Sequence, residues 1–126
     1  MKEIKSVVSE ICSRALEGTL TLDEFCALWP QFLFTTPFYY QIYDDLEYGI
    51  EHTPGFFFKR GIDYEAWIDS DAYLRIFLDS VLLNYNKDVD TLQQCRNFVL
   101  QDKNLTKEII QNSVEGYFNQ QYKPGA

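Results

Sequence analysis

Residues 36–51 of this chain, TPFYYQIYDDLEYGIE, have the pattern of an amphipathic helix. Thr36 and Pro37 suit its start. Proline lacks a backbone N–H, but the N–H at the first helical position has no intrahelical acceptor, so nothing is lost there. A projection at about 100° per residue places two stripes side by side. The apolar stripe consists of Tyr39, Ile42, Tyr43, Leu46 and Ile50, and the second stripe, which mixes acids with tyrosines, consists of Tyr40, Asp44, Glu47, Tyr48 and Glu51.

Apolar residues recur at helical spacing on both sides of this segment, and no sustained alternation of period two indicates a strand. Thr21 with Glu24 has the form of a capping box, and Asp88 or Asp90, and then Thr106, can cap later helices. The sequence therefore predicts an all-α fold, with one domain over residues 1–126 built as a bundle of five or six amphipathic helices. The expected helices cover roughly residues 3–17, 22–29, 37–51, 71–86, 90–102 and 106–121.

Length and composition fit one globular domain. The 126 residues suffice to bury a core, and 46% of them are hydrophobic. The three cysteines, Cys12, Cys26 and Cys95, form no CxxC pair and fall on or near apolar helix faces, so we expect them to be small core residues. Neither a signal peptide nor the roughly 18 apolar residues of a membrane span is evident. We therefore expect a cytoplasmic protein, and the net charge of −8 disfavours nucleic acids and anionic membranes as partners.

The negative charge is concentrated in the middle of the chain. Residues 23–90 carry thirteen acidic residues against four basic ones, an excess of nine, although the net charge of the whole chain is −8. Besides the acidic stripe and the adjacent Asp45, a second cluster surrounds Trp67 and comprises Asp63, Glu65, Asp69 and Asp71. Because aromatic side chains anchor interfaces and carboxylates select a basic partner, we expect both clusters to bind a basic protein.

The residues offer little for catalysis or metal binding. His52 is the only histidine, which excludes a histidine-based triad and a multi-histidine metal site. Residues 86–97 begin like a calcium loop but have Thr91 and Asn97 where that loop needs a glycine and an acid. The second acidic cluster could hold a magnesium ion, but capping of the following helix explains two of its acids without one. We expect no enzymatic activity, no cofactor and no bound metal.

Three short segments follow one another in a characteristic order around the acidic helix. An opening helix ends in residues 15–18 (ALEG), residues 19–25 (TLTLDEF) come next, and residues 71–75 (DAYLR) lead into a long amphipathic helix. Over residues 1–86 this order resembles bacterial immunity proteins of the colicin D type and of contact-dependent growth inhibition systems. The resemblance implies a helical, cytoplasmic, non-enzymatic inhibitor of one cognate toxin, often a tRNA-cleaving nuclease. By position, the acids that would face the basic cleft of the toxin are Asp44, Asp45, Glu47, Glu51, Asp69 and Asp71.

We therefore expect an immunity protein that binds a cognate basic toxin, such as a nuclease, and covers its active cleft. The expected aromatic anchors are Tyr40, Tyr48 and Trp67, and the free protein would be a monomer or a weak dimer. Two alternatives are an acidic regulatory or adaptor protein that mimics nucleic acid, and a helical subunit whose aromatic residues are buried in an oligomer. The expected partner-binding residues are Tyr40, Asp44, Asp45, Glu47, Tyr48, Glu51, Asp63, Glu65, Trp67, Asp69 and Asp71.

Overall fold

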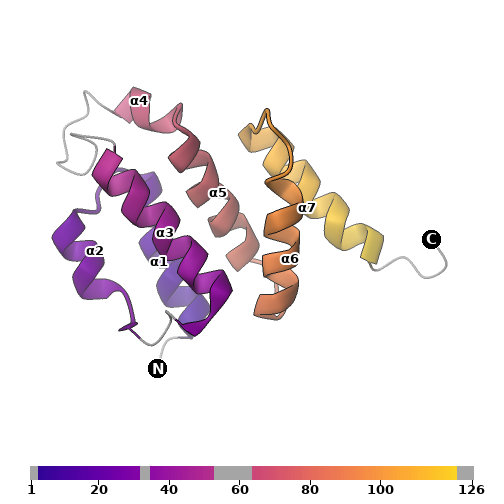
Figure 1. Ribbon diagram of the computed structural model, residues 1–126, viewed down its shortest axis with the longest axis horizontal. Coiled ribbons are helices and arrows are strands. Elements are labelled where there is room, and N and C mark those ends of the chain that lie inside the picture. Colours follow the sequence, from indigo (N-terminus) through magenta and orange to yellow (C-terminus); the bar gives the residue numbers. More distant parts are fainter. Residues whose placement is uncertain (1–2, 32–34, 53–63, 122–126) are drawn as a thin grey trace.

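The structure of the chain is a computed structural model that describes residues 3–31, 35–52 and 64–121 (Figure 1). These residues form helices joined by short connections, and no strand occurs among them. The helices are α1 (Ile4–Leu16), α2 (Leu22–Leu28), α3 (Pro37–His52), α4 (Tyr64–Ile68), α5 (Asp71–Leu83), α6 (Val89–Val99) and α7 (Lys107–Gln121). The all-α prediction is confirmed. The short helix α4 lies in a stretch to which the sequence pattern assigned no helix.

Local capping chemistry sets several helix ends. Thr21 and Glu24 form the predicted capping box, because the Glu24 amide donates to the Thr21 hydroxyl and the Thr21 amide donates to the Glu24 carboxylate, each over 3.1 Å. Asp88 accepts from the Thr91 amide at the start of α6. After α1 the chain passes through Gly18, whose φ of 75° lies in the left-handed region that favours glycine.

Helix α5 is the centre of the bundle. It packs against α1, α3, α4, α6 and α7, so neighbours surround it on most sides (Figure 1). Helical spacing in the sequence predicts a core stripe of Leu74, Phe77, Leu78, Val81, Leu82 and Tyr85 on this helix, but of these only Leu78 and Leu82 are fully buried. Residues outside the stripe are buried as well, namely Ala72, Tyr73, Ile76, Asp79 and Leu83.

Helix α3 keeps the two sides that its sequence predicts. Tyr39, Ile42 and Leu46 are buried, and the remaining members of the apolar stripe are half-buried. Helix α2 covers part of this side through aromatic packing, with the ring centroids of Phe25 and Tyr43 5.2 Å apart. The opposite side of α3 lines the groove described below.

Two predictions about individual core residues need correction. Cys12 and Cys95 are buried as expected, but Cys26 is exposed on α2, because that short helix turns Phe25 rather than Cys26 toward the core. Trp67 of α4, expected as an exposed anchor, is fully buried. Its indole packs so close to α3 that a Cβ atom on Gly49 would lie 3.0 Å from the ring. Trp67 is therefore a core residue that fastens α4 to α3.

Candidate functional site: an acidic groove between α3 and α5

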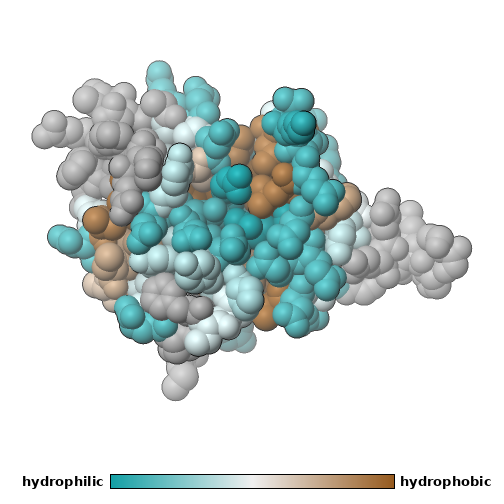
Figure 2. Space-filling view, viewed as in Figure 1, coloured by the Kyte–Doolittle hydropathy of each residue, from teal (hydrophilic) through white to brown (hydrophobic). Residues whose placement is uncertain are grey.

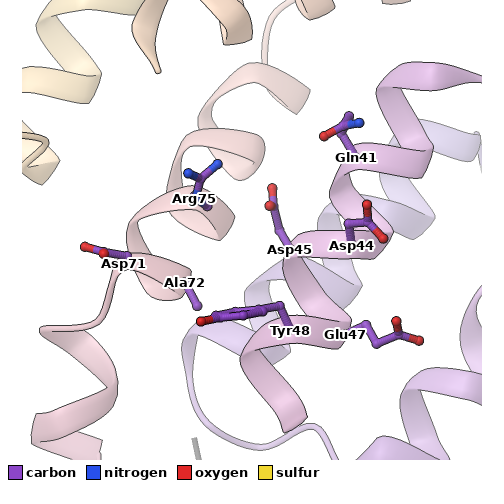
Figure 3. A pocket seen from close by; sticks show the side chains of 8 residues that line it. All are labelled: Gln41, Asp44, Asp45, Glu47, Tyr48, Asp71, Ala72 and Arg75. Atoms are coloured by element: carbon purple, nitrogen blue, oxygen red, sulfur yellow. The ribbon is translucent and has the colours of Figure 1, made fainter. Parts of the chain in front are cut away.

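A groove of about 520 Å³ runs between α3 and α5. Hydrophilic residues cover this part of the surface in the view of Figure 2. Figure 3 shows the groove from close by. Four carboxylates and one guanidinium line it, so acids outnumber bases among its described lining residues. The lining residues are Gln41, Asp44, Asp45, Glu47 and Tyr48 from α3, and Asp71, Ala72 and Arg75 from α5. We refer to these residues as the acidic groove.

The periodicity of α3 explains why its acids gather on one side. Asp44 and Tyr48 are four residues apart, which places them one above the other on the helix surface. Asp44 is exposed, and Tyr48 leaves 57% of its surface accessible while its ring extends from α3 toward Ala72 (Figure 3). Tyr40, one turn before Asp44, is 43% exposed. An acidic side with accessible aromatic rings is therefore a property of the fold.

Glu47 is held at the edge of this site by a neighbour from the buried side of α3. The Tyr43 hydroxyl donates a hydrogen bond of 2.7 Å to the Glu47 carboxylate. This hydrogen bond, followed by burial and the charge of Glu47, raises the pKa of Tyr43 to about 12. Because Phe25 packs against the same tyrosine ring, the apolar packing of α2 on α3 also fixes where Glu47 lies.

The carboxylates of the acidic groove disfavour one another. Partial burial, followed by the charges of Asp45 and Glu47, raises the pKa of Asp44 above its ordinary value, and Arg96 opposes this rise. Arg75 is the only base among the described residues that line the groove. A cation brought into the groove from outside would therefore relieve repulsion that the free protein carries.

Asp45 has a different role from the one predicted. Only 7% of its surface is exposed, and its Oδ2 atom lies 2.5 Å from Nη2 of Arg96 on α6. Nε of the same arginine donates to Oδ1 of Asp79 on α5 over 2.9 Å. The prediction that Asp45 contacts a partner is corrected accordingly: its carboxylate belongs to a buried cluster of Asp45, Asp79 and Arg96 that joins α3, α5 and α6 beneath the groove.

Sequence reasoning missed Asp79 and Arg96. A signal for them exists, because each is a charged residue inside an apolar helical pattern. Asp79 lies three residues after Ile76 and three before Leu82, and Arg96 lies three residues before Val99. Two opposite charges in apolar patterns on separate helices indicate a buried ion pair, since a charge is rarely buried without a partner.

The second predicted cluster does not come together as one site. Asp71 lines the acidic groove, whereas Glu65 and Asp69 are exposed but do not line it. Ser70, not Asp69, caps α5 by accepting a hydrogen bond from the Tyr73 amide over 3.1 Å. Asp63 and the side chain of Glu51 lie outside the described residues. The structure therefore unites Asp44, Glu47 and Tyr48 of α3 with Asp71 of α5.

A metal-holding cluster and a membrane-spanning helix are both absent from the described part of the chain. No group of three or more His, Cys, Asp or Glu side chains there is arranged to hold a metal ion. Every helix of residues 3–31, 35–52 and 64–121 falls short of the length and apolar character that crossing a membrane requires. Comparison of the chain with models of known protein families, with curated proteins and with solved structures gave no match.

Proposed function

We propose that the acidic groove binds a basic surface of another protein. The observation that carries this proposal is the composition of a concave surface: three acids outside the buried ion cluster (Asp44, Glu47 and Asp71) and a tyrosine that is 57% exposed line it, with Arg75 as the single base among the described lining residues. Clustered charge of one sign in a concave site concentrates its field and steers a ligand of opposite charge. The complement of this groove is therefore a protuberance that carries Lys or Arg.

The two kinds of groove residue would contribute differently to binding. Carboxylates at the rim, such as Asp44 and Asp71, would mainly accelerate association and select a basic partner. Tyr48 can bury its ring against the partner and receive a Lys or Arg cation over its face, which is the kind of contact that dominates interface energies. Loss of Tyr48 would therefore mainly accelerate dissociation.

The biological role that we propose is immunity toward a bacterial toxin. This step rests on the resemblance of residues 1–86 to immunity proteins, and the acidic groove supplies a physical means for it. A nuclease binds phosphates in a basic cleft, and carboxylates on a protein surface can occupy the places of those phosphates. The chain would then act in the cytoplasm as a stoichiometric inhibitor and not as an enzyme.

A charge-reversal experiment tests this function. The variant Asp44→Lys with Glu47→Lys changes the groove by four charges, and Glu17→Lys with Glu115→Lys makes the same change at exposed residues that do not line it. Both variants, and the unaltered chain, would be expressed in cells that produce the protein encoded directly before this gene, where the proposal places the cognate toxin. We expect the groove variant to lose protection and the control to keep it. Full protection by a folded groove variant would refute the assigned surface.

Salt dependence gives an independent measurement. Affinity for the purified toxin should fall steeply from low to high ionic strength, because the attraction is between exposed charges that salt screens. The alternative acidic regulator predicts the same salt dependence with a nucleic-acid-binding protein instead of a toxin. Recovery of the bound protein from the native strain, followed by its identification, distinguishes these two partners.

An oligomeric subunit is the second candidate, and one observation favours it. Phe98 on α6 is 50% exposed, and its ring lies 5.3 Å from that of Tyr117 on α7, so two helices present aromatic surface together. The mass of the isolated protein in solution decides between the candidates. A stable oligomer whose mass falls in Phe98→Ser would favour the subunit, whereas a monomer leaves the groove as the interaction site.

A further inference from the structure

A second groove of about 520 Å³ adjoins the acidic groove on the other flank of α5. Three leucines come from different parts of the chain to line it: Leu74 from α5, Leu100 at the end of α6, and Leu105 before α7. All three are half-buried, so each keeps accessible apolar surface. Figure 2 shows an apolar area in this region, between α5 and the neighbouring ends of α6 and α7. We call Leu74, Leu100 and Leu105 the leucine compartment.

The two grooves share Asp71 and Arg75. These residues are four apart, so they lie one above the other and form a ridge along α5. At about 100° per residue, Ala72 lies on one flank of this ridge and Leu74 on the other. The acidic groove and the leucine compartment are thus two halves of one surface, divided by a ridge that is one side chain wide.

The charges of the second groove differ from those of the first. Asp71 and Asp102 are matched there by Arg75 and Lys103, so the lining is close to neutral. A purely basic ligand would gain nothing by entering it, whereas an apolar side chain would remove leucine surface from water. The two halves therefore select for two different side chains.

We propose that the acidic groove and the leucine compartment together bind one segment of a basic protein, in which an apolar side chain lies next to a Lys or Arg. This inference rests on the proposed function, since the partner is the same. Charge complementarity places the cation against α3, and continuity across the ridge places the apolar side chain against Leu74 and Leu105. The leucine compartment then distinguishes the cognate partner from other basic proteins of equal charge.

Peptides of defined composition test this inference with the full chain. The probes are capped hexalysine and a capped nonapeptide of six Lys and three Leu, which carries the same charge, titrated into isotope-labelled protein while amide signals and affinity are followed. We expect hexalysine to shift signals of the acidic groove, along Asp44 to Tyr48 and at Asp71, and to leave those of Leu74 and Leu105 unchanged. The mixed peptide should also shift Leu74 and Leu105 and bind roughly tenfold more tightly, as burial of about one leucine side chain predicts.

Two variants separate apolar contact from charge. Leu105→Glu adds a negative charge, so it would strengthen binding of the mixed peptide if charge alone mattered, and we expect it to weaken binding instead. Leu105 is half-buried, so its replacement by Glu also disturbs packing. Asn104→Trp therefore serves as the second variant: Asn104 is exposed, and a bulky ring there would block the compartment without altering the core. Both variants should bind hexalysine at least as well as the unaltered chain.

The outcomes for the two proposals differ. If the mixed peptide binds no better than hexalysine, or if Asn104→Trp leaves its affinity unchanged, the leucine compartment is not a binding site, while the acidic groove stands. If hexalysine produces no shifts in α3 and Asp44→Lys with Glu47→Lys leaves toxin binding intact, the acidic groove is not the binding site for a basic partner. The inference about the leucine compartment then fails as well.

Discussion

Arg96 on α6 and Asp45 on α3 are joined by a contact of 2.5 Å, although 51 residues separate them in the sequence. The guanidinium leaves only 3% of its surface exposed and also binds the fully buried Asp79 of α5. Burial by itself would lower the pKa of Arg96, but the charges of Asp79 and Asp45 outweigh it and raise that pKa. One cation therefore holds together the three helices that support the acidic groove.

Replacement of this cation should destabilise the fold strongly. Arg96→Met keeps much of the apolar volume but leaves the buried Asp45 and Asp79 without their cationic partner, and breaking a buried pair in this way typically costs about 3–5 kcal/mol. Urea unfolding measures the change. The control is Arg14→Met, which removes a half-exposed ion pair with Glu24 and should change stability far less. Equal losses in the two variants would contradict the role assigned to Arg96.

The same cluster predicts how stability depends on pH. Burial, followed by the charge of Asp45, raises the pKa of Asp79 well above its ordinary value. The folded chain then retains a proton that the unfolded chain has already released, so stability falls as the pH rises from the ordinary value of this carboxyl through its raised one. Asp79→Asn should flatten this decline, because an amide keeps the acceptor for Arg96 and carries no charge. Urea midpoints from pH 5 to 8 measure both slopes, and parallel curves would count against the assignment.

Local chemistry explains how much of the fold could be predicted. The capping box of Thr21 and Glu24 depends on residues three apart, and the two sides of α3 depend on residues three and four apart, so both are visible in the sequence. The burial of α5 depends on five neighbouring helices, which no local pattern records. For that reason the apolar stripe predicted for α5 was narrower than its buried surface.

The candidate site likewise has a part that the local sequence pattern predicts and a part that depends on packing between helices. Asp44, Glu47 and Tyr48 line the groove where the projection of α3 places them, whereas Tyr40 is exposed but does not line it. Only the packing of α5 beside α3 brings the predicted Asp71 to the same site and adds Arg75. Asp45 is adjacent to Asp44 in sequence and is the same residue type. It is nevertheless buried, because it forms an ion pair with Arg96 of α6. Tryptophan is a residue type that often anchors interfaces, but α4 turns the Trp67 side chain inward, against Gly49 of α3.

Two helical glycines should respond in opposite directions to alanine. A Cβ at Gly49 would lie 3.0 Å and 3.1 Å from two atoms of the fully buried Trp67 ring, which has little room to move, whereas a Cβ at Gly116 meets nothing within 4 Å. Gly116→Ala should stabilise the protein by about 0.5–1 kcal/mol, the gain in helix propensity. Gly49→Ala should lower stability in spite of that gain. Thermal unfolding measures both, and a stabilising Gly49→Ala would show that the contact with Trp67 yields easily.

Arg75 should weaken the binding of a basic partner, because it is the only base among the described lining residues of the acidic groove. Arg75→Gln removes its charge from the exposed ridge of α5 while it keeps a polar side chain of similar length. We expect affinity for the proposed basic partner, or for hexalysine, to rise about two- to fivefold at low salt, the range that one exposed charge usually contributes. Most of the gain should lie in the association rate and should vanish at high ionic strength, where exposed charges are screened.

The matched control is Lys103→Gln, which removes a base that lines only the second groove and should change hexalysine affinity less. If Arg75→Gln instead weakens binding at every salt concentration, the guanidinium contacts the partner directly, and the acidic groove does not act by charge attraction alone.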